Sequence, residues 1–156
     1  MKKGLVSRFL GAVIPVAFGL CVAGWIWGWF AQTKTISASL EKTFNDTHIV
    51  TVNEVQVYKK SPLAEPELIL IGTFQNKGME TSFLFTAKIR VFQNGVELSE
   101  QSVSGFSSDI FSKTIQNGAS FDFKKGYKLN DTTSPVEVRI YDWILSDYVS
   151  ETYNIK

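Results

Sequence analysis

The chain has 156 residues, a formal net charge of +1, 44% hydrophobic residues, one cysteine and one histidine. The near-neutral charge argues against a nucleic-acid-binding protein, which needs clustered Lys and Arg. A single cysteine forms no intramolecular disulfide, and a lone histidine with no cysteine in the folded part argues against a zinc site. We therefore expect neither a cofactor nor a metal ion.

The first element of the chain is a run without any charge, residues 9–31. As a helix this run would span on the order of 34 Å, enough to cross the hydrocarbon core of a bilayer. The preceding residues 1–8 contain Lys2, Lys3 and Arg8. Three tryptophans end the run, as an aromatic belt at a membrane interface would: Trp25, Trp27 and Trp29. The pattern predicts a cytoplasmic basic tail, a single-pass signal anchor and, by the positive-inside rule, an extracellular C-terminal domain.

Two other interpretations of this terminus compete with the signal anchor. A cleaved signal peptide could end near Val22-Ala23-Gly24, although the apolar run continues past these small residues. A lipoprotein signal could end at Cys21, although Phe18-Gly19-Leu20 and the apolar residues after the cysteine fit that pattern poorly. Within an anchor, Gly24 and Gly28 would let two helices approach closely and form a homodimer.

Residues 32–46 are mostly polar, and we interpret them as a juxtamembrane stalk that leads into a domain at residues 47–156. The apolar pattern then changes to a period of two, which predicts strands. His48 to Tyr58 is the first strand, and its phase change predicts a β-bulge near Asn53-Glu54. Glu67 to Gln75 is apolar on both faces, which favours a central strand.

The middle of the domain predicts a β-hairpin. Ser82 to Phe92 alternates cleanly, with Phe83, Phe85, Ala87, Ile89 and Val91 inward. Asn94-Gly95 follows and supplies both positive-φ positions of a type I′ turn. Val96 to Val103 is expected to return antiparallel.

The remaining strands are expected at residues 119–129, 136–141 and 148–155, after a Ser-rich irregular segment at 105–112. Phe121 and Phe123 point inward in the first of them, and a turn at 130–135 follows it. About seven short strands separated by turns predict an all-β fold, an immunoglobulin-like antiparallel β-sandwich. A small antiparallel barrel is the alternative.

Several segments together resemble one family: Thr73-Phe74-Gln75-Asn76, Phe92-Gln93-Asn94-Gly95-Val96-Glu97-Leu98, Gln116-Asn117-Gly118, Tyr127-Lys128-Leu129 and Ser134-Pro135-Val136-Glu137-Val138. The chain resembles, over residues 47–142, the immunoglobulin-like extracytoplasmic domain called domain-of-unknown-function family 5067. The resemblance implies a β-sandwich, an exported location and a Gram-positive bacterial or prophage source. It supplies no catalytic residue, because the family has no assigned chemistry. The N-terminus departs from the family by lacking the lipobox of many members.

No catalytic group is evident in the sequence. His48 stands at the start of a strand, and no Gly-x-Ser-x-Gly motif accompanies it, so a solvated strand-end histidine is the simpler interpretation. Ser107-Ser108-Asp109 and Asn130-Asp131-Thr132 offer oxygens for calcium, but ordinary turn chemistry explains both.

The best candidate contact surface is the aromatic C-terminal region, with Tyr141, Trp143, Tyr148 and Tyr153. The alternative is that these residues cover the open end of the sandwich. We expect a non-enzymatic, membrane-anchored binding or adaptor module whose partner is a protein or a cell-envelope component. A prophage-encoded superinfection-exclusion or immunity protein is the second interpretation, and an enzyme is a distant third.

Overall fold

The computed structural model describes residues 32–59, 64–78, 82–83, 88–103, 114–142 and 146–156, and all regular structure in these ranges is β-strand. Within these ranges no helix has the length and apolar character needed to cross a bilayer. The predicted tail and anchor at residues 1–31 lie outside the described residues, and so do the residues assigned to them: Cys21, Gly24, Trp25, Trp27, Gly28 and Trp29.

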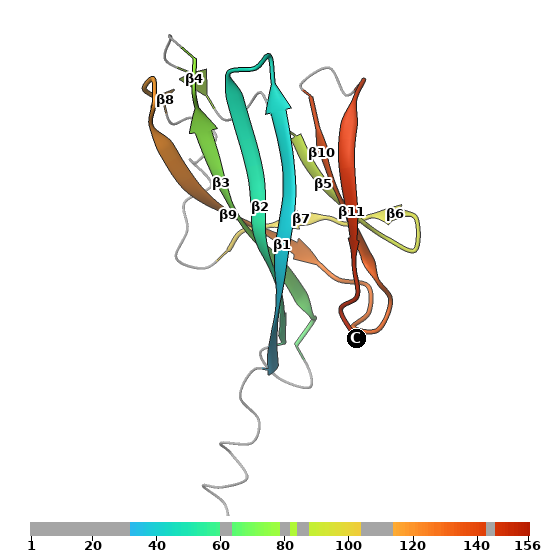
Figure 1. The fold of residues 1–156 in the computed structure, drawn as a ribbon. Helices are drawn as coiled ribbons and strands as arrows, with labels where there is room; N and C mark the ends of the chain where they lie inside the picture. The colour runs from blue at the N-terminus through green and yellow to red at the C-terminus, as the bar shows by residue number, and fades with distance from the viewer. Residues whose placement is uncertain (1–31, 60–63, 79–81, 84–87, 104–113, 143–145) are drawn as a thin grey trace, which may run out of the picture.

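Two antiparallel sheets form the body of the domain (Figure 1). The five-stranded sheet has the order β1 (Gln32–Phe44), β2 (His48–Lys59), β3 (Glu67–Asn76), β9 (Ser120–Lys128) and β7 (Glu100–Gln101). The four-stranded sheet has the order β11 (Tyr148–Tyr153), β10 (Val136–Tyr141), β5 (Lys88–Gln93) and β6 (Val96–Glu97). A separate pair joins β4 (Ser82–Phe83) to β8 (Thr114–Ile115).

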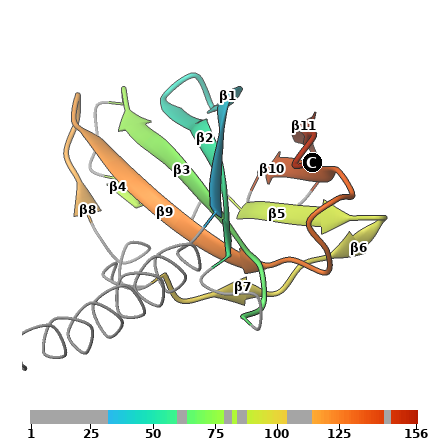
Figure 2. The ribbon, with the colours of Figure 1, turned by 90° about the horizontal axis from the view of Figure 1, so that it is seen from below.

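One apolar core joins the two main sheets, which are seen from their lower end in Figure 2. Burying apolar surface stabilises a fold by about 25 cal/mol per Å², and this core contains no disulfide. The two sheets are also tied by a hydrogen bond from the Tyr127 hydroxyl to the Ile89 carbonyl, 3.1 Å apart. Burial raises the pKa of the Tyr127 hydroxyl well above its ordinary value, so the group stays a donor.

The β-bulge predicted in the first long strand is confirmed, because the register of β2 against β3 shifts between Val52 and Glu54. The extra residue lets valines on both sides of the bulge point inward. Val50, Val52 and Val55 are accordingly fully buried. The prediction of a central strand is also confirmed, since β3 lies between β2 and β9.

The prediction of a stalk at residues 32–46 is wrong. Gln32–Phe44 is the edge strand β1, and it pairs with β2 from Gln32↔Lys59 to Phe44↔His48. The segment looked polar because an edge strand needs only a few apolar contacts on one face, here mainly Ile36, Leu40 and Phe44. Gln32, the first residue that the structure describes, therefore already belongs to the sheet.

Two other predicted strands are each divided between sheets. The predicted strand 82–92 is described as β4 and β5, which belong to different sheets, and Phe85 and Ala87 lie outside the described residues. The predicted strand 96–103 starts as β6 beside β5 and continues as β7 beside β9. The chain changes sheets at Leu98 and Ser99, where the Leu98 amide donates to Val91 and the Ser99 carbonyl accepts from Lys128.

The hairpin turn and the last three strands agree with the sequence patterns. Asn94 and Gly95 have φ values of 52° and 77°, the two positive angles that a type I′ turn requires. The strands β9, β10 and β11 fall within the predicted ranges 119–129, 136–141 and 148–155.

Candidate functional site

Two of the four aromatic residues predicted as a contact surface meet on the outer face of the four-stranded sheet. Tyr141 and Tyr148 are directly opposite each other in register, and their ring centroids are 5.0 Å apart. Tyr148 is 45% exposed, whereas Tyr141 is 9% exposed under its neighbours. The other two differ: Tyr153 is a core residue, 4% exposed, and Trp143 lies outside the described residues. Tyr153 thus belongs to the hydrophobic core.

Strand alternation adds three residues to these tyrosines on the same face. Arg139 is two residues before Tyr141 on β10, and β5 places Arg90 opposite Arg139 and Phe92 opposite Glu137. We call the resulting set the arginine–aromatic face: Arg90, Phe92, Arg139, Tyr141 and Tyr148. The sequence patterns indicated the two tyrosines and missed the others, because β5 and β10 become neighbours only through the sheet order.

Arg139 is the centre of this face. Its guanidinium carbon lies 4.4 Å from the centroid of the Phe92 ring and 5.0 Å from that of Tyr148. The guanidinium donates two hydrogen bonds of 2.8 Å to the Glu137 carboxylate and a third, of 3.2 Å, to the Tyr141 hydroxyl. The Arg139 hydrogen bond lowers the pKa of Glu137 below its ordinary value, so the pair stays charged. These contacts hold the guanidinium plane in one orientation.

Arg90 is less completely paired. One terminal nitrogen donates to Glu97 at 3.2 Å, and the guanidinium lies 5.5 Å from the Tyr141 ring. Its Nε atom is buried and has no hydrogen-bond partner among the described residues. The face can therefore present a fixed arginine, a second arginine and an exposed phenol to a partner that carries carboxylate or aromatic groups.

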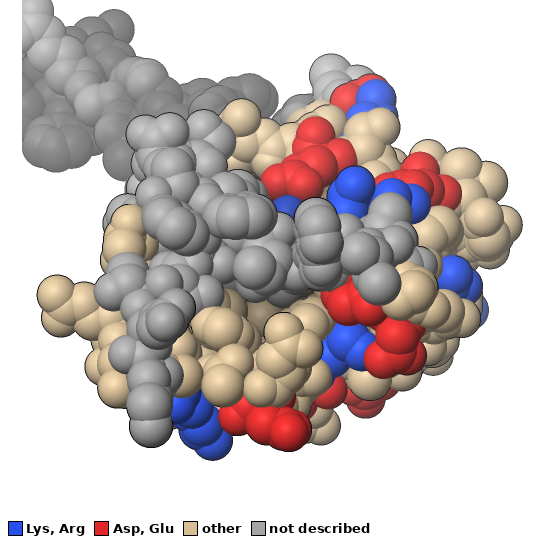
Figure 3. Space-filling view, turned by 90° about the horizontal axis from the view of Figure 1, so that it is seen from above, with Lys and Arg blue, Asp and Glu red and all other residues tan. Residues whose placement is uncertain are grey.

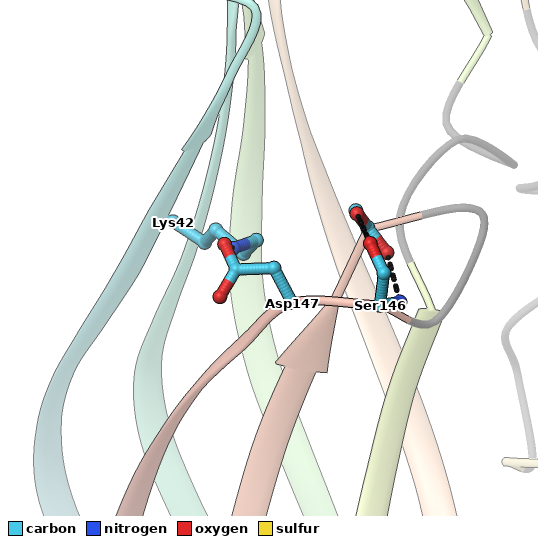
Figure 4. Close-up of polar contacts among 4 residues, drawn as sticks. Lys42, Ser146 and Asp147 are labelled. Carbon is cyan, nitrogen blue, oxygen red and sulfur yellow. Dashed lines mark hydrogen bonds and ion pairs between the residues drawn. The ribbon is translucent and has the colours of Figure 1, made fainter.

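The described ends of the connection between β10 and β11, Asp142 and Ser146-Asp147, adjoin this face and make polar contacts (Figure 4). The Asp142 carboxylate accepts hydrogen bonds from the backbone and the hydroxyl of Ser146, at 2.9 and 2.8 Å. Next to it, the Lys42 ammonium of β1 forms an ion pair of 2.6 Å with Asp147. The Lys42 side chain is 8% exposed and that of Asp147 is 76% exposed. This ion pair joins the edge of one sheet to the edge of the other.

The unequal burial of this ion pair predicts unequal effects of removing each partner. Asp147→Ala leaves a nearly buried ammonium without its carboxylate, and we expect it to destabilise the domain by about 1–2 kcal/mol. Lys42→Met keeps the apolar stem and leaves Asp147 in water, so we expect a change below about 0.5 kcal/mol. Urea denaturation of both variants measures the difference. Equal losses would show that the ion pair behaves as a surface pair.

His48 is the first residue of β2, at the strand start where the sequence placed it, and its side chain is half-buried. Its ring stacks on Phe74 with centroids 5.8 Å apart, and its Nδ1 atom is 2.8 Å from the Thr47 hydroxyl. In the described part of the chain, no three His, Cys, Asp or Glu side chains are placed to hold a metal ion.

The polar residues of the family-like segments have structural contacts. Asn76 is fully buried, its side chain donates to the Ile115 carbonyl, and its side-chain oxygen accepts from the Gly78 amide. Its backbone carbonyl also accepts from Gly118, at the turn of the segment Gln116-Asn117-Gly118. Asn76 thus joins the end of β3 to the loop that leads into β9.

Gln93, like Asn76, joins a strand to a loop through its buried side chain, at the opposite end of the fold. Its buried amide group donates to the carbonyls of Asp131 and Ser134, both at 3.1 Å. Its carbonyl oxygen accepts from the Asn130 amide at 2.9 Å and the Asp131 amide at 3.2 Å. The glutamine of the hairpin motif therefore holds the loop 130–135 against β5, which links two of the family-like segments.

The Asp131 carboxylate completes that loop, and its contacts confirm the turn interpretation. One oxygen accepts from the Thr133 amide at 2.7 Å and the Ser134 amide at 2.6 Å. These bonds, that from Ser134 first, lower the pKa of Asp131 to about 2. The other calcium candidate, Ser107-Ser108-Asp109, lies outside the described residues.

The lowered pKa of Asp131 predicts a loss of stability in acid. A carboxylate with a depressed folded pKa stabilises the native state above the unfolded pKa, near 4, and this stabilisation disappears as the pH falls toward 2. Asp131→Asn keeps an acceptor oxygen but does not titrate. We expect urea midpoints measured between pH 5 and pH 2 to fall less in the variant than in the wild type. Parallel profiles would contradict the assignment.

Comparisons with known proteins place these features in a family. Residues 31–142 match the family described as "Domain of unknown function (DUF5067)". No curated protein matches the chain. The match starts at the first residues of β1, which agrees with the assignment of that strand to the domain.

Three solved structures share the fold at low sequence identity. A functionally unknown protein from Listeria monocytogenes EGD-e has a TM-score of 0.61 and 15% identity, over 83% of this chain and 89% of that chain. A conserved hypothetical protein from Bacillus anthracis has a TM-score of 0.59 and 14% identity, over 80% and 98%. A Bacillus subtilis strain 168 protein described as a "putative lipoprotein" has a TM-score of 0.55 and 14% identity, over 76% of this chain but only 39% of its own.

These likenesses concern the fold alone, because each identity is far below 25%. The family match covers well over half of the chain, and its residue range includes both of the buried amide side chains that hold the loops. The chain belongs to the DUF5067 family of domains of unknown function.

Proposed function

We propose that the chain is a non-enzymatic binding module with an immunoglobulin-like sandwich fold, held outside the cell membrane by residues 9–31. The observation that carries this proposal is the arginine–aromatic face. It combines an exposed phenol with two guanidinium groups on a sheet whose hydrogen bonds keep it rigid. Tyrosine and arginine are enriched among the residues that dominate binding energy, and ordering them beforehand lowers the entropic cost of association.

Two further observations support the proposal. The polar residues of the family-like segments, Asn76 and Gln93, hold loops in place, so a structural role accounts for both of them. One protein of the same fold is described as a "putative lipoprotein", which agrees with a domain tethered at a bacterial membrane. A protein or a cell-envelope component with carboxylate or aromatic groups is the partner that fits the face.

The test is site-specific crosslinking in intact cells. A photoreactive phenylalanine analogue at position 148 should give a discrete crosslinked product, and the Arg139→Ala change in the same protein should reduce it more than tenfold. The matched control is the same analogue at Tyr58, which lies near the end of β2 in the other sheet. Equal products from both positions, or none from position 148, would refute the proposal.

A second experiment separates binding from catalysis. His48→Ala removes the only histidine, so a cellular phenotype of the gene should persist in this variant once the protein is shown to fold. Loss of the phenotype with unchanged crosslinking from position 148 would favour an enzyme.

A further inference from the structure

The strand β1 follows the uncharged run directly in the sequence. Residues 9–31 carry no charge, and β1 starts at Gln32, the next residue. A chain that leaves a bilayer at residue 31 therefore enters a paired strand at once, because Gln32 is already opposite Lys59 in register. The end of the domain that contains Gln32 is thus brought next to the lipid headgroups.

The register of both sheets identifies the other segments at this end. β1 starts here and β2 ends here, since Gln32 pairs with Lys59. In the other sheet β11 ends here, because the Lys34 ammonium contacts the carbonyls of Asn154, at 3.3 Å, and of Lys156. Figure 1 shows the start of β1 and the C-terminus at the same, lower end of the domain.

The charges at this end are mixed. Acidic residues (Glu65, Glu67 and Asp131) accompany the basic ones (Lys34, Lys59, Lys128 and Lys156), and Lys128 is paired with Glu65. Electrostatic attraction to anionic lipid, which needs clusters of basic residues, would therefore be weak. This end is brought to the membrane by the direct covalent link between residue 31 and Gln32.

The buried Lys42 of β1 indicates the height of Tyr148, at one end of the arginine–aromatic face. Lys42 is ten residues after Gln32, which corresponds to about 33 Å along a strand at 3.3 Å per residue. Its ion pair with Asp147 places the neighbouring Tyr148 at the same level.

The far end of the domain, seen in Figure 3, carries acidic and basic side chains side by side rather than a field of one sign.

We propose that the end of the domain carrying Gln32 and Lys156 rests on lipid headgroups, and that β1 holds the arginine–aromatic face up to about 33 Å above the membrane surface. This proposal rests on the anchored, extracytoplasmic function proposed above. It places Tyr148, which lies at the level of Lys42, where a partner outside the bilayer can contact it.

The experiment measures the height of both ends in proteoliposomes. The full chain carries Cys21→Ser and one new cysteine for a fluorophore, either Lys156→Cys at the lower end or Lys77→Cys beside the β1–β2 turn at the upper end. Neutral phosphatidylcholine vesicles contain a lipid with a nitroxide on its headgroup, which quenches only nearby fluorophores. We expect quenching at position 156 to exceed that at position 77 at least fivefold, in low and in high salt. Equal quenching at both positions would overturn the proposal.

A spacer variant tests the cause of this arrangement. Twelve Gly and Ser residues inserted between Ala31 and Gln32 reach about 19 Å and leave every described residue unchanged. Quenching at position 156 should then fall toward the level at position 77. Unchanged quenching would show that the direct link between Ala31 and Gln32 is not what holds this end of the domain at the membrane. Labelling of Lys77→Cys on intact cells by a membrane-impermeant thiol reagent tests the extracytoplasmic location separately. Its failure would refute the proposed function without altering the result in vesicles.

Discussion

Replacing Gln93 by Leu is expected to destabilise the domain by about 2–4 kcal/mol. The buried amide makes four hydrogen bonds to the loop 130–135, and each contributes about 0.5–1.5 kcal/mol net. Leucine of similar size fills the space but leaves two amide donors and two carbonyl acceptors without this partner. Chemical denaturation monitored by tryptophan fluorescence or circular dichroism measures the loss.

The matched control for this change is Gln116→Leu. Gln116 is also a glutamine of a family-like segment, but its side chain is exposed. We expect its substitution to change the free energy of unfolding by less than about 0.5 kcal/mol. A loss below about 1 kcal/mol for Gln93→Leu would show that the loop is held mainly by other contacts, such as those of Asp131.

Replacing Gly72 by Ala is expected to cost about 2–3 kcal/mol, at the upper end of the range for overpacked cores. A Cβ atom on Gly72 would lie 2.3 Å from the Thr51 carbonyl oxygen and 2.4 Å from the tip of the Phe123 ring. The contact with Thr51 involves backbone of the neighbouring strand β2, next to the bulge, so it cannot be relieved by a side-chain rotation. Thermal and urea denaturation of the variant test the prediction.

A double variant separates the two clashes. Phe123→Leu removes the ring and should lower the cost of Gly72→Ala, leaving the part that comes from Thr51. Gly95→Ala is a control with a different cause, because Gly95 has φ +77° and open space around it. It should cost about 1–2 kcal/mol from backbone strain alone. An unchanged denaturation midpoint in Gly72→Ala would show that β2 and β3 are farther apart than described.

The strands that sequence patterns predicted best are those with one continuous buried face. In β10, Val136, Val138 and Ile140 are fully buried and alternate with half-buried polar residues. The bulge in β2 was also predictable, because only an inserted residue lets Val52 and Val55 share a face. In these elements the residues that alternate as apolar in the sequence are the same residues that the tertiary structure buries.

The edge strand β1 shows why a stalk was predicted in its place. Two lysines of β1 reach across the seam between the sheets: the exposed Lys34 to the carbonyls of Asn154 and Lys156, and the buried Lys42 to Asp147. A lysine breaks an apolar alternation in the sequence. In the structure its stem lies along the core edge and its ammonium finds an oxygen of the other sheet.

The candidate site was predictable only in part for a similar reason. Tyr141 and Tyr148 were singled out by residue type, but the aromatic signal does not separate a surface tyrosine from the buried Tyr153. Arg90 and Phe92 are almost fifty residues away from Arg139 in the chain. They join the face because β5 pairs with β10, a non-consecutive pairing that no local pattern encodes.

The sequence by itself determined the uncharged N-terminal run, the all-β class of the domain, the bulge, the hairpin turn at Asn94-Gly95 and the resemblance to a family whose match is now shown. These are local properties, set by alternation, by turn residues and by charge. Only the tertiary structure decided where β1 belongs, where the chain changes sheets at Leu98, and which side chains form the arginine–aromatic face. These features depend on pairings between strands that are distant in the sequence. The free energy of such a pairing comes from surface that the strands bury against each other, so no single segment predicts it.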